Sequence, residues 1–440
     1  MIKSRGAIVA LLTGLNFLNY LDRFVVAAVL PPLMKELGLS NFQGGLIATV
    51  FLLGYFVTAP LFGKLGDRLS RKKLIAFGVV TWSAATVASG MATSLWLLLI
   101  ARAFVGIGEA SYATLAPTII DDVSPPDKKG KMLALFFLAV PVGSACGYLL
   151  GGFIQQHWGW RTAFFVAGGP GVVLALLCLV IQEPVRKHLA DAKAKILETA
   201  ATLSRVPLYR RAVLGYCAHT AAIGAFAFWA PKFLSEHFRD DLAAHPGTTT
   251  AAAEALAAAN FRFGIVTVVA GAIGTIVGGW MADRAVRGLP LIPDGSDHDH
   301  LHNRMAANAQ LRVCALGVAI AAPMTAAAFL VPSALLFFVC AGIAEVGLFL
   351  STSPINIIML RTVPAFMRAS AMAVAIFSIH LFGDLWSPSL LGLMMDYLPI
   401  VAAMMALPAL FGIAALVWWP RKHEGEAGSA GNLPAARLRD

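Results

Sequence analysis

Charged residues are scarce in this sequence. Asp, Glu, Lys and Arg make up 13% of its 440 residues, about half of the share in a typical soluble protein. Hydrophobic residues make up 58%, so we expect most of the chain to contact lipid or other apolar side chains. A formal net charge of +10 would indicate a nucleic-acid partner in a soluble protein. Here the basic residues lie in short segments between apolar runs, so no nucleic-acid binding is predicted.

The sequence also lacks the motifs of several other protein classes. Its five cysteines lie inside apolar runs without CxxC spacing, which predicts neither disulfides nor a metal site. There is no nucleotide-binding loop, so ATP is not the expected energy source. No GxSxG or HxxxxD motif indicates an enzyme. The chain is therefore predicted to be neither an enzyme nor dependent on a cofactor.

One tract, at residues 297–302, alternates histidine with aspartate in the sequence DHDHLH. Alternating histidines can bind a divalent ion, but only composition supports such a site here. The prediction for the chain is that it has no resident metal, and whether this tract binds one stays open.

Apolar runs long enough to cross a bilayer recur along the chain. A helix needs about 20 apolar residues to cross a hydrocarbon core about 30 Å thick. Twelve runs meet this requirement, so the predicted fold is an all-α integral membrane protein with twelve transmembrane helices. The expected spans are 7–33, 43–63, 74–92, 95–120, 131–156, 161–182, 210–236, 260–283, 312–331, 333–359, 368–391 and 397–419.

Basic residues are distributed unequally between the two sides of the predicted membrane. If the N-terminus is cytoplasmic, 27 of the 34 Lys and Arg residues lie in cytoplasmic segments. The positive-inside rule therefore predicts a multi-pass protein with both termini in the cytoplasm. The alanine-rich composition and the short loops favour a bacterial inner membrane.

A short motif occurs once in each half of the chain. Residues 63–71 and 279–287 both follow the pattern GxxxDRxxR, displaced by 216 residues. Internal repeats of this kind build two-lobed secondary transporters. The sequence therefore predicts two pseudo-symmetric six-helix bundles, with a cytoplasmic linker and a cytoplasmic tail. The boundaries are 1–183 and 210–420 for the bundles, 184–209 for the linker and 421–440 for the tail.

The two copies of the motif carry residues that we predict to act in gating. Asp67 is expected to pair with a basic partner in the other half, because an acid adds nothing to the positive-inside bias. Arg68 and Arg71 are expected to anchor at lipid headgroups. Asp283 and Arg284 hold the matching positions in the second copy.

Several motifs resemble those of known families. GKLGDRLSRKK at 63–73 is similar to the loop signature of the major facilitator superfamily. NYLDR at 19–23, RAFVGIGEASY at 102–112 and SIHLFGDLWSP at 378–388 together resemble the Spinster family of proton-linked lysolipid and sphingolipid-phosphate transporters. The resemblance covers nearly the whole chain apart from the loop at 284–311 and the tail. It implies an alternating-access carrier for amphiphiles with a charged head.

Four charged residues of these motifs lie inside predicted spans. Asp22 and Arg23 are in the first span, and Arg102 and Glu109 share one face of the fourth, because seven residues make nearly two helical turns. A charge at the centre of a bilayer costs about 2.5–3.5 kcal/mol on insertion scales. The four charges sum to zero, so pairing between the two spans would offset much of this cost.

The resemblance places the family's functional charges at the same four positions. We hypothesise that Asp22 and Glu109 carry the proton and that Arg102 is their switchable partner, with Arg23 completing the proton-coupling set. A carboxyl group inside the membrane can gain and lose a proton as water access changes sides. An arginine released in this way could hold a phosphate or a carboxylate. A purely structural role for the neutral quartet stays open.

A second group of polar residues is predicted to contact substrate. His380 and Asp384 are four residues apart, so they form either a protonatable pair or a hydrogen bond that ties their helix to a neighbour. Glu345 stands as an unpaired carboxylate in apolar sequence, and His219 is of a type that more often serves packing. The predicted set is Arg102, Asn16, Asn19, Tyr20, Tyr112, His219, Glu345, His380 and Asp384.

Together these features predict a proton-coupled secondary active transporter of a charged amphiphile, such as a lysophospholipid or a sphingosine-phosphate-like lipid. The alternative is a proton-coupled organic-anion or drug transporter of the same superfamily. The expected partners are the substrate, protons and membrane lipids, and the expected state is a monomer. Symport or antiport, direction, stoichiometry and resting conformation stay open.

Overall fold

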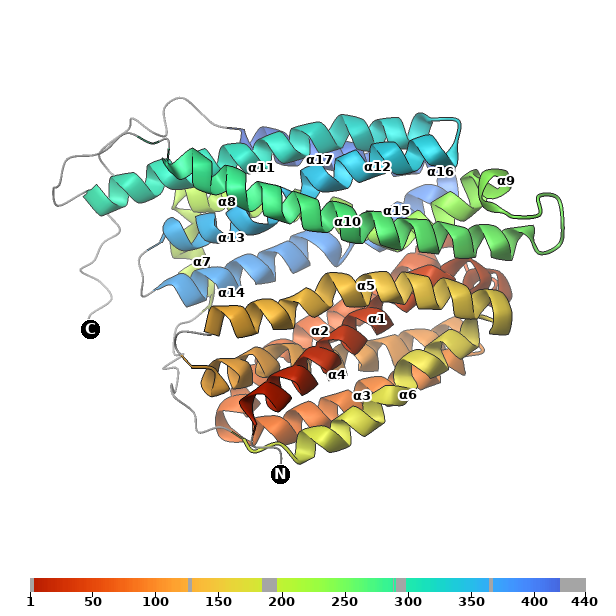
Figure 1. Cartoon of the computed structure of the whole chain (residues 1–440), viewed down its shortest axis with the longest axis horizontal. Helices are drawn as coiled ribbons and strands as arrows, with labels where there is room; N and C mark the ends of the chain where they lie inside the picture. Colours follow the sequence, from red (N-terminus) through yellow and green to blue (C-terminus); the bar gives the residue numbers. More distant parts are fainter. Residues whose placement is uncertain are drawn as a thin grey trace.

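The described part of the chain folds almost entirely into helices (Figure 1). The computed structural model describes residues 4–125, 129–183, 196–287, 289, 298–363 and 367–419. Within these residues, 12 helical segments are long and apolar enough to cross a membrane. The predicted number of spans is therefore confirmed.

The first six spans form what we call the N half, drawn from red to yellow in Figure 1. Local signals set some of their ends. Gly38 adopts a left-handed conformation (φ 63°) after the first helix, and Ser40 and Gln43 form a capping box at the start of the second. The helices are α1 (Arg5–Leu37), α2 (Asn41–Arg68), α3 (Arg71–Gly90), α4 (Leu95–Val123), α5 (Lys129–Trp158) and α6 (Trp160–Leu179).

The other six spans form the C half, drawn from green to blue at the top of Figure 1. Its tenth span is broken after Phe349, and its eleventh contains a π-helical turn in which the Leu385 amide donates to the His380 carbonyl. Its elements are α8 (Pro207–His237), α9 (Arg239–Leu242), α10 (Ala251–Arg287), α11 (His298–Leu330), α12 (Ala334–Phe349), α13 (Thr352–Arg361), α14 (Arg368–Ile379), η2 (His380–Asp384), α15 (Ser387–Tyr397), α16 (Ile400–Met404) and α17 (Ala406–Trp418).

Segments between the predicted spans also contain helices. The helix α10 begins at Ala251, so part of the loop expected at 237–259 is helical. The short helix α7 (Ile196–Ser204) occupies part of the predicted linker. Residues 184–195 of the linker and the predicted tail lie outside the described residues.

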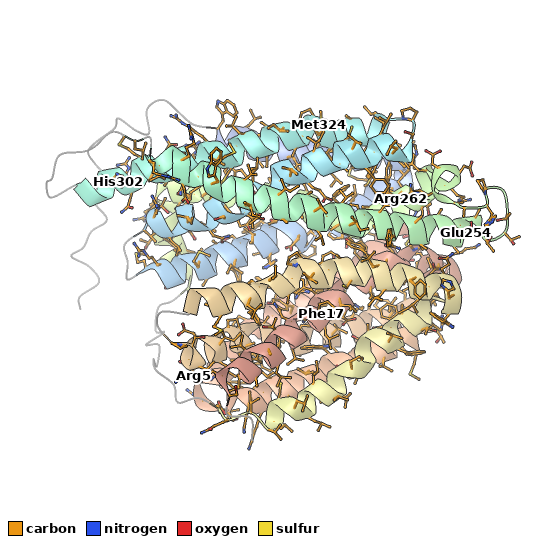
Figure 2. The ribbon with its side chains drawn as sticks, in the orientation of Figure 1. Arg5, Phe17, Glu254, Arg262, His302 and Met324 are labelled. Carbon is orange, nitrogen blue, oxygen red and sulfur yellow. The ribbon has the colours of Figure 1, made fainter. Side chains whose placement is uncertain are left out.

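The two ends of the molecule can be told apart in Figure 2. Arg5 and His302 lie at one end, and Glu254 lies at the opposite end. We call the first end the N face and the second the distal face.

The fourth helices of the two halves begin in the same way. The Ser94 side chain accepts a hydrogen bond from the Leu97 amide at the start of α4. The Ser333 side chain accepts one from the Leu336 amide at the start of α12. Each serine therefore satisfies an amide that has no partner within its helix.

The same two helices also make matching glycine crossings. Gly108 of α4 packs against Gly78 of α3, and Gly347 of α12 packs against Gly317 of α11. Caps and glycines are all displaced by 239 residues between the halves. The motif displacement of 216 is smaller, because the chain between α10 and α11 is longer than that between α2 and α3.

Two seams join the halves. In the first, α2 lies against α15. The Asp396 carboxylate accepts hydrogen bonds from the Asn41 amide (2.7 Å) and the Phe42 amide (2.9 Å), and the hydroxyls of Thr49 and Ser389 are 2.6 Å apart. Those amides belong to the first turn of α2, where a carboxylate also complements the helix dipole.

In the second seam, α5 and α1 lie against α10 and α8. The Asn260 side chain donates to the Ala28 carbonyl (2.9 Å), and the Tyr148 hydroxyl donates to the Ala227 carbonyl (2.6 Å). Gly152 permits the close approach, because a Cβ there would lie 2.8 Å from the Asn260 Cβ. The hydrogen bonds of both seams lie in the half of the molecule nearer the distal face.

Replacing Gly108 by alanine tests the crossing of α3 and α4. The added methyl group would lie 2.5 Å from the Gly78 carbonyl oxygen and 2.6 Å from the Trp82 nitrogen, so the helices must move apart. We expect a destabilisation of about 1–3 kcal/mol, measured as a lower midpoint of thermal unfolding of the purified protein. Gly14→Ala is the matched control, because its methyl group meets nothing within 4 Å. An equal loss in both variants would contradict the close crossing.

Candidate functional site

Four charged side chains meet between α1 and α4. Arg23 Nη2 lies 2.8 Å from Glu109 Oε2, and Arg23 Nε lies 3.0 Å from the same oxygen. Arg102 Nη1 lies 3.8 Å from Asp22 Oδ1. The structure thus brings together the four residues selected from the sequence. In this structure Glu109 pairs with Arg23, and Arg102 lies nearest to Asp22.

Helical geometry explains this pairing. Asp22 and Arg23 are adjacent on α1, so their side chains diverge by about 100° around the helix. Arg102 and Glu109 lie nearly two turns apart on α4 and therefore meet α1 at two different levels. Each carboxylate consequently lies nearest to a different arginine.

The Asp22–Arg102 pair is enclosed. The two side chains are 1% and 2% exposed, and the Thr86 hydroxyl of α3 donates to Asp22 Oδ2 at 2.6 Å. Among the described residues, Nε and Nη1 of Arg102 find no hydrogen-bond acceptor. Buried N–H groups without partners are costly, so this pair is incompletely compensated. Thr86 was not selected from the sequence, because a single threonine in an apolar helix carries no distinguishing signal.

Aromatic rings surround the other arginine. The Arg23 guanidinium lies 5.0 Å from the ring centre of Tyr20, 5.0 Å from that of Phe51 and 5.3 Å from that of Tyr55. Cation–π contacts of this kind stabilise a guanidinium where water is excluded. Tyr20 was predicted to contact substrate, whereas Phe51 and Tyr55 were missed although their spacing of four places them on one face of α2.

Only one member of the Arg23–Glu109 pair is exposed. The Arg23 side chain is 21% exposed, whereas its partner Glu109 is fully enclosed. Arg23 is therefore the charged group of the quartet that an entering anion would reach first.

Three other predicted substrate contacts are buried between helices. The Asn16 side chain donates to the Phe136 carbonyl of α5 (2.9 Å). The Tyr112 hydroxyl donates to the Leu12 carbonyl, and its ring packs edge-on against Trp82. Both residues are buried, as is Asn19, whose side-chain nitrogen has no described hydrogen-bond partner. For Asn16 and Tyr112 the structure supports a packing role, which the polar stripe in the sequence did not distinguish from a binding role.

The buried polar residues of the C half lie apart from the quartet. His219 is enclosed among Phe411, Trp418 and Tyr216, with its Nε2 3.4 Å from the Ser351 hydroxyl. This environment fits a packing histidine better than a substrate contact.

Glu345 lies on α12 and is 4% exposed. Its Oε1 accepts a hydrogen bond from the Thr267 hydroxyl of α10 at 3.1 Å. The sequence predicted an unpaired carboxylate here, and the structure adds this one hydrogen bond.

His380 and Asp384 contact each other as their spacing predicts. His380 Nδ1 lies 2.9 Å from Asp384 Oδ1. The two residues are the ends of η2, and their side chains are 31% and 22% exposed. Both side chains are therefore less enclosed than those of Asp22, Arg102 and Glu109.

The predicted gating residues fall into two groups. Asp67, Arg68, Asp283 and Arg284 are exposed at the N face, and the pairing expected for Asp67 stays a prediction. Arg71 departs from its prediction, because its side chain is buried within the protein rather than exposed to lipid headgroups.

Arg71 instead joins α3 to α4 and to the end of α6. Its Nη1 lies 2.8 Å from Asp122 Oδ2 and 3.0 Å from the Thr118 hydroxyl, and its amide donates to Glu183 Oε1 at 2.7 Å. The residue therefore stabilises the N half internally.

No group of three or more His, Cys, Asp or Glu residues is placed to hold a metal ion within the described parts of the chain. Most of the tract at 297–302 lies outside the residues whose side chains are described.

Known proteins resemble this chain over most of its length. The sequence profile of the Major Facilitator Superfamily matches residues 12–383. Protein spinster of Drosophila melanogaster is 34% identical over 403 residues, covering 89% of this chain and 62% of the fly protein. A sphingosine-1-phosphate transporter of Danio rerio is 32% identical over 414 residues, covering 90% of this chain and 78% of that protein. The chain belongs to the major facilitator superfamily and to its Spinster family.

A solved structure has the same fold. The crystal structure of a bacterial homolog of the human lysosomal transporter Spinster matches with a TM-score of 0.77 at 23% identity, covering 94% of this chain and 96% of that one. The superfamily profile and the Spinster relatives make this chain a multi-pass membrane transporter rather than an enzyme. It is shorter than the fly protein, of which it spans 62%.

Breaking the enclosed pair tests the site in this Spinster-family chain. Asp22→Leu leaves the Arg102 charge buried without a partner, so we expect a loss of about 3–5 kcal/mol in stability. Asp22→Leu combined with Arg102→Met removes both charges and should recover most of that loss. Thermal unfolding midpoints of the purified proteins measure both effects.

Glu36→Gln is the control, at an ion pair with Arg161 whose side chains are 54% and 32% exposed. Exposed pairs contribute about 1 kcal/mol or less, so this variant should change little. A double variant as unstable as Asp22→Leu alone would argue against charge compensation as the role of the pair.

Proposed function

We propose that this chain is a proton-coupled carrier of an anionic amphiphile, with the proton carried by Asp22 and Glu109. The observation that supports this most directly is the enclosed quartet, in which each carboxyl group is held by a different arginine. A proton added to either carboxyl group cancels the charge that holds its partner. The released guanidinium then needs another anion, which a substrate head group can supply.

The two arginines would act in sequence. Arg23 is the more exposed, so its fork of N–H donors can receive a phosphate or carboxylate while Glu109 accepts a proton. Arg102 has N–H groups that lack acceptors, and it would take up the head group only when α1 shifts against α4. Tyr20 and Tyr55 beside Arg23 offer hydroxyl groups at the edge of the same region.

The positions of the seams support alternating access. Hydrogen bonds between the halves lie towards the distal face, so this conformation is closed there. With the N face in the cytoplasm, as the distribution of basic residues predicts, the carrier would be closed to the outside. The bacterial homolog with the same fold is described as inward-facing and unoccupied.

A lipid substrate is proposed from the relatives. The zebrafish relative is named for transport of sphingosine 1-phosphate, whose single phosphate suits an arginine and whose chain suits an apolar wall. We extend this class to lysophospholipids, which share a charged head and one acyl chain.

Uptake into proteoliposomes tests the proposal. The probes are sphingosine 1-phosphate and lysophosphatidylethanolamine, with benzoate as a short organic anion, each with and without a pH gradient. We expect the gradient to stimulate uptake of at least one lipid, and Asp22→Asn and Glu109→Gln each to reduce that stimulation at least tenfold. Glu236→Gln, at an exposed residue paired with Lys232, should leave it unchanged.

Two results would count against the proposal. Full stimulation in both Asp22→Asn and Glu109→Gln would remove these residues from proton coupling. Stimulated uptake of benzoate but of neither lipid would favour the organic-anion alternative.

Asp396→Ala tests the distal closure. The variant removes the carboxylate that accepts from the Asn41 and Phe42 amides. We expect the equilibrium to shift by about 1–2 kcal/mol, or roughly 5- to 30-fold, towards a distal-open state. Double electron–electron resonance between spin labels at Gln156 and Asp240 would show a larger share of long distances.

Glu236→Ala removes an exposed acid that pairs only within α8 among the described residues, so it serves as the control. Unchanged distances in Asp396→Ala would mean that the other contacts of the seams suffice for closure.

A further inference from the structure

The fourth helix of each half carries one enclosed carboxyl group. Glu109 lies 15 residues after the capping Ser94 of α4, and Glu345 lies 12 residues after the capping Ser333 of α12. The two carboxyl groups therefore sit about one helical turn apart in depth. Both halves bury a carboxyl group on this helix, but the two carboxyl groups have different partners.

The N half neutralises its carboxyl groups with arginines, and the C half does not. At the 239-residue displacement shared by the caps and the glycines, the counterpart of Arg102 is Ala341. Among the described residues, Glu345 forms no ion pair, and Oε2 has no hydrogen-bond partner. Its one polar contact is the Thr267 hydroxyl, 3.1 Å from Oε1.

The elements packed against α12 supply no compensating charge. The charged residues of α10 and α11 are at exposed or terminal positions, and none pairs with Glu345 in the described parts of the chain. A buried titratable group that interacts electrostatically with Glu345 is Tyr148 of α5. The Tyr148 hydroxyl already donates to the Ala227 carbonyl.

We infer that Glu345 is a second proton-binding site, located in the C half and independent of the quartet, and that it holds its proton in this distal-closed conformation. An ionised carboxylate with one hydroxyl donor and no counter-charge costs far more than a neutral carboxylic acid in the same place. The Thr267 hydroxyl fits the neutral form, in which Oε1 is the carbonyl oxygen and Oε2 carries the proton.

The location suggests when the proton would leave. Glu345 lies on the face of α12 that meets α10, and α10 also forms the seam with α5 through Asn260 and Gly264. Separation of α5 from α10 would admit water as a proton acceptor. This step rests on the proposed transport cycle, whereas the protonated state of Glu345 in the distal-closed form does not.

Infrared spectroscopy of the full-length protein in lipid tests the inference directly. At pH 7, the difference spectrum between the wild type and Glu345→Gln should show the loss of one protonated carboxyl C=O band. Glu236→Gln is the control, because its exposed carboxylate is paired with Lys232. That variant should lose only ionised-carboxylate bands.

Thr267→Val gives a second readout that keeps Glu345 in place. Loss of the hydroxyl donor to Oε1 should move the C=O band to higher frequency without removing it. Loss of ionised-carboxylate bands in Glu345→Gln, or an unmoved C=O band in Thr267→Val, would overturn the inference.

The spectra are independent of any substrate. Failure of every lipid probe in the uptake assay would sink the proposed function and leave the protonated band in place. Transport with an ionised Glu345 would leave the proposed function standing and remove the second proton site.

Discussion

A charge inside this chain's membrane-spanning helices must be neutralised by its immediate neighbours, and much of the structure depends on that constraint. Lipid offers no water to solvate an ion, so each charged side chain needs a counter-charge, a proton or a route to water. In the N half, two ion pairs between α1 and α4 supply the counter-charges. The position of α4 relative to α3 and α2 is in turn set by glycines that permit backbone contact, among them Gly78 and Gly108.

The two halves share a framework and differ in chemistry. Serine caps and glycine crossings recur at one displacement, so the backbone of α4 is repeated in α12. The side chains on this repeated framework are not repeated, since arginine in one half corresponds to alanine in the other. A C half without a counterpart of the charged quartet would suit the long apolar end of the proposed cargo, and the N half its charged end.

Much of the fold could be predicted from the sequence, because spanning length and charge distribution are properties of local composition. The twelve predicted spans were correct for that reason. The contact between His380 and Asp384 was predicted from their spacing of four residues on one helix. The pairing within the quartet could not be predicted, since it depends on the rotation of α1 against α4. Arg71 was misassigned to the membrane surface because its partners Asp122 and Glu183 come from α4 and from the segment that follows α6. The contact of Asp396 with the start of α2 joins residues about 355 positions apart, which one sequence does not reveal.

The π-helical turn at His380–Asp384 changes the direction in which the side chains after it point. One residue beyond the α-helical count turns everything after it by about 100°. The face that α15 presents to α2 is therefore a quarter turn or more away from the face that an uninterrupted span would present. With this offset, Ser389 contacts Thr49 and Asp396 contacts Asn41 across the seam. The eleventh span thus consists of two short helical segments that present different faces. The segment before the π-helical turn packs against α8, and α15 packs against α2.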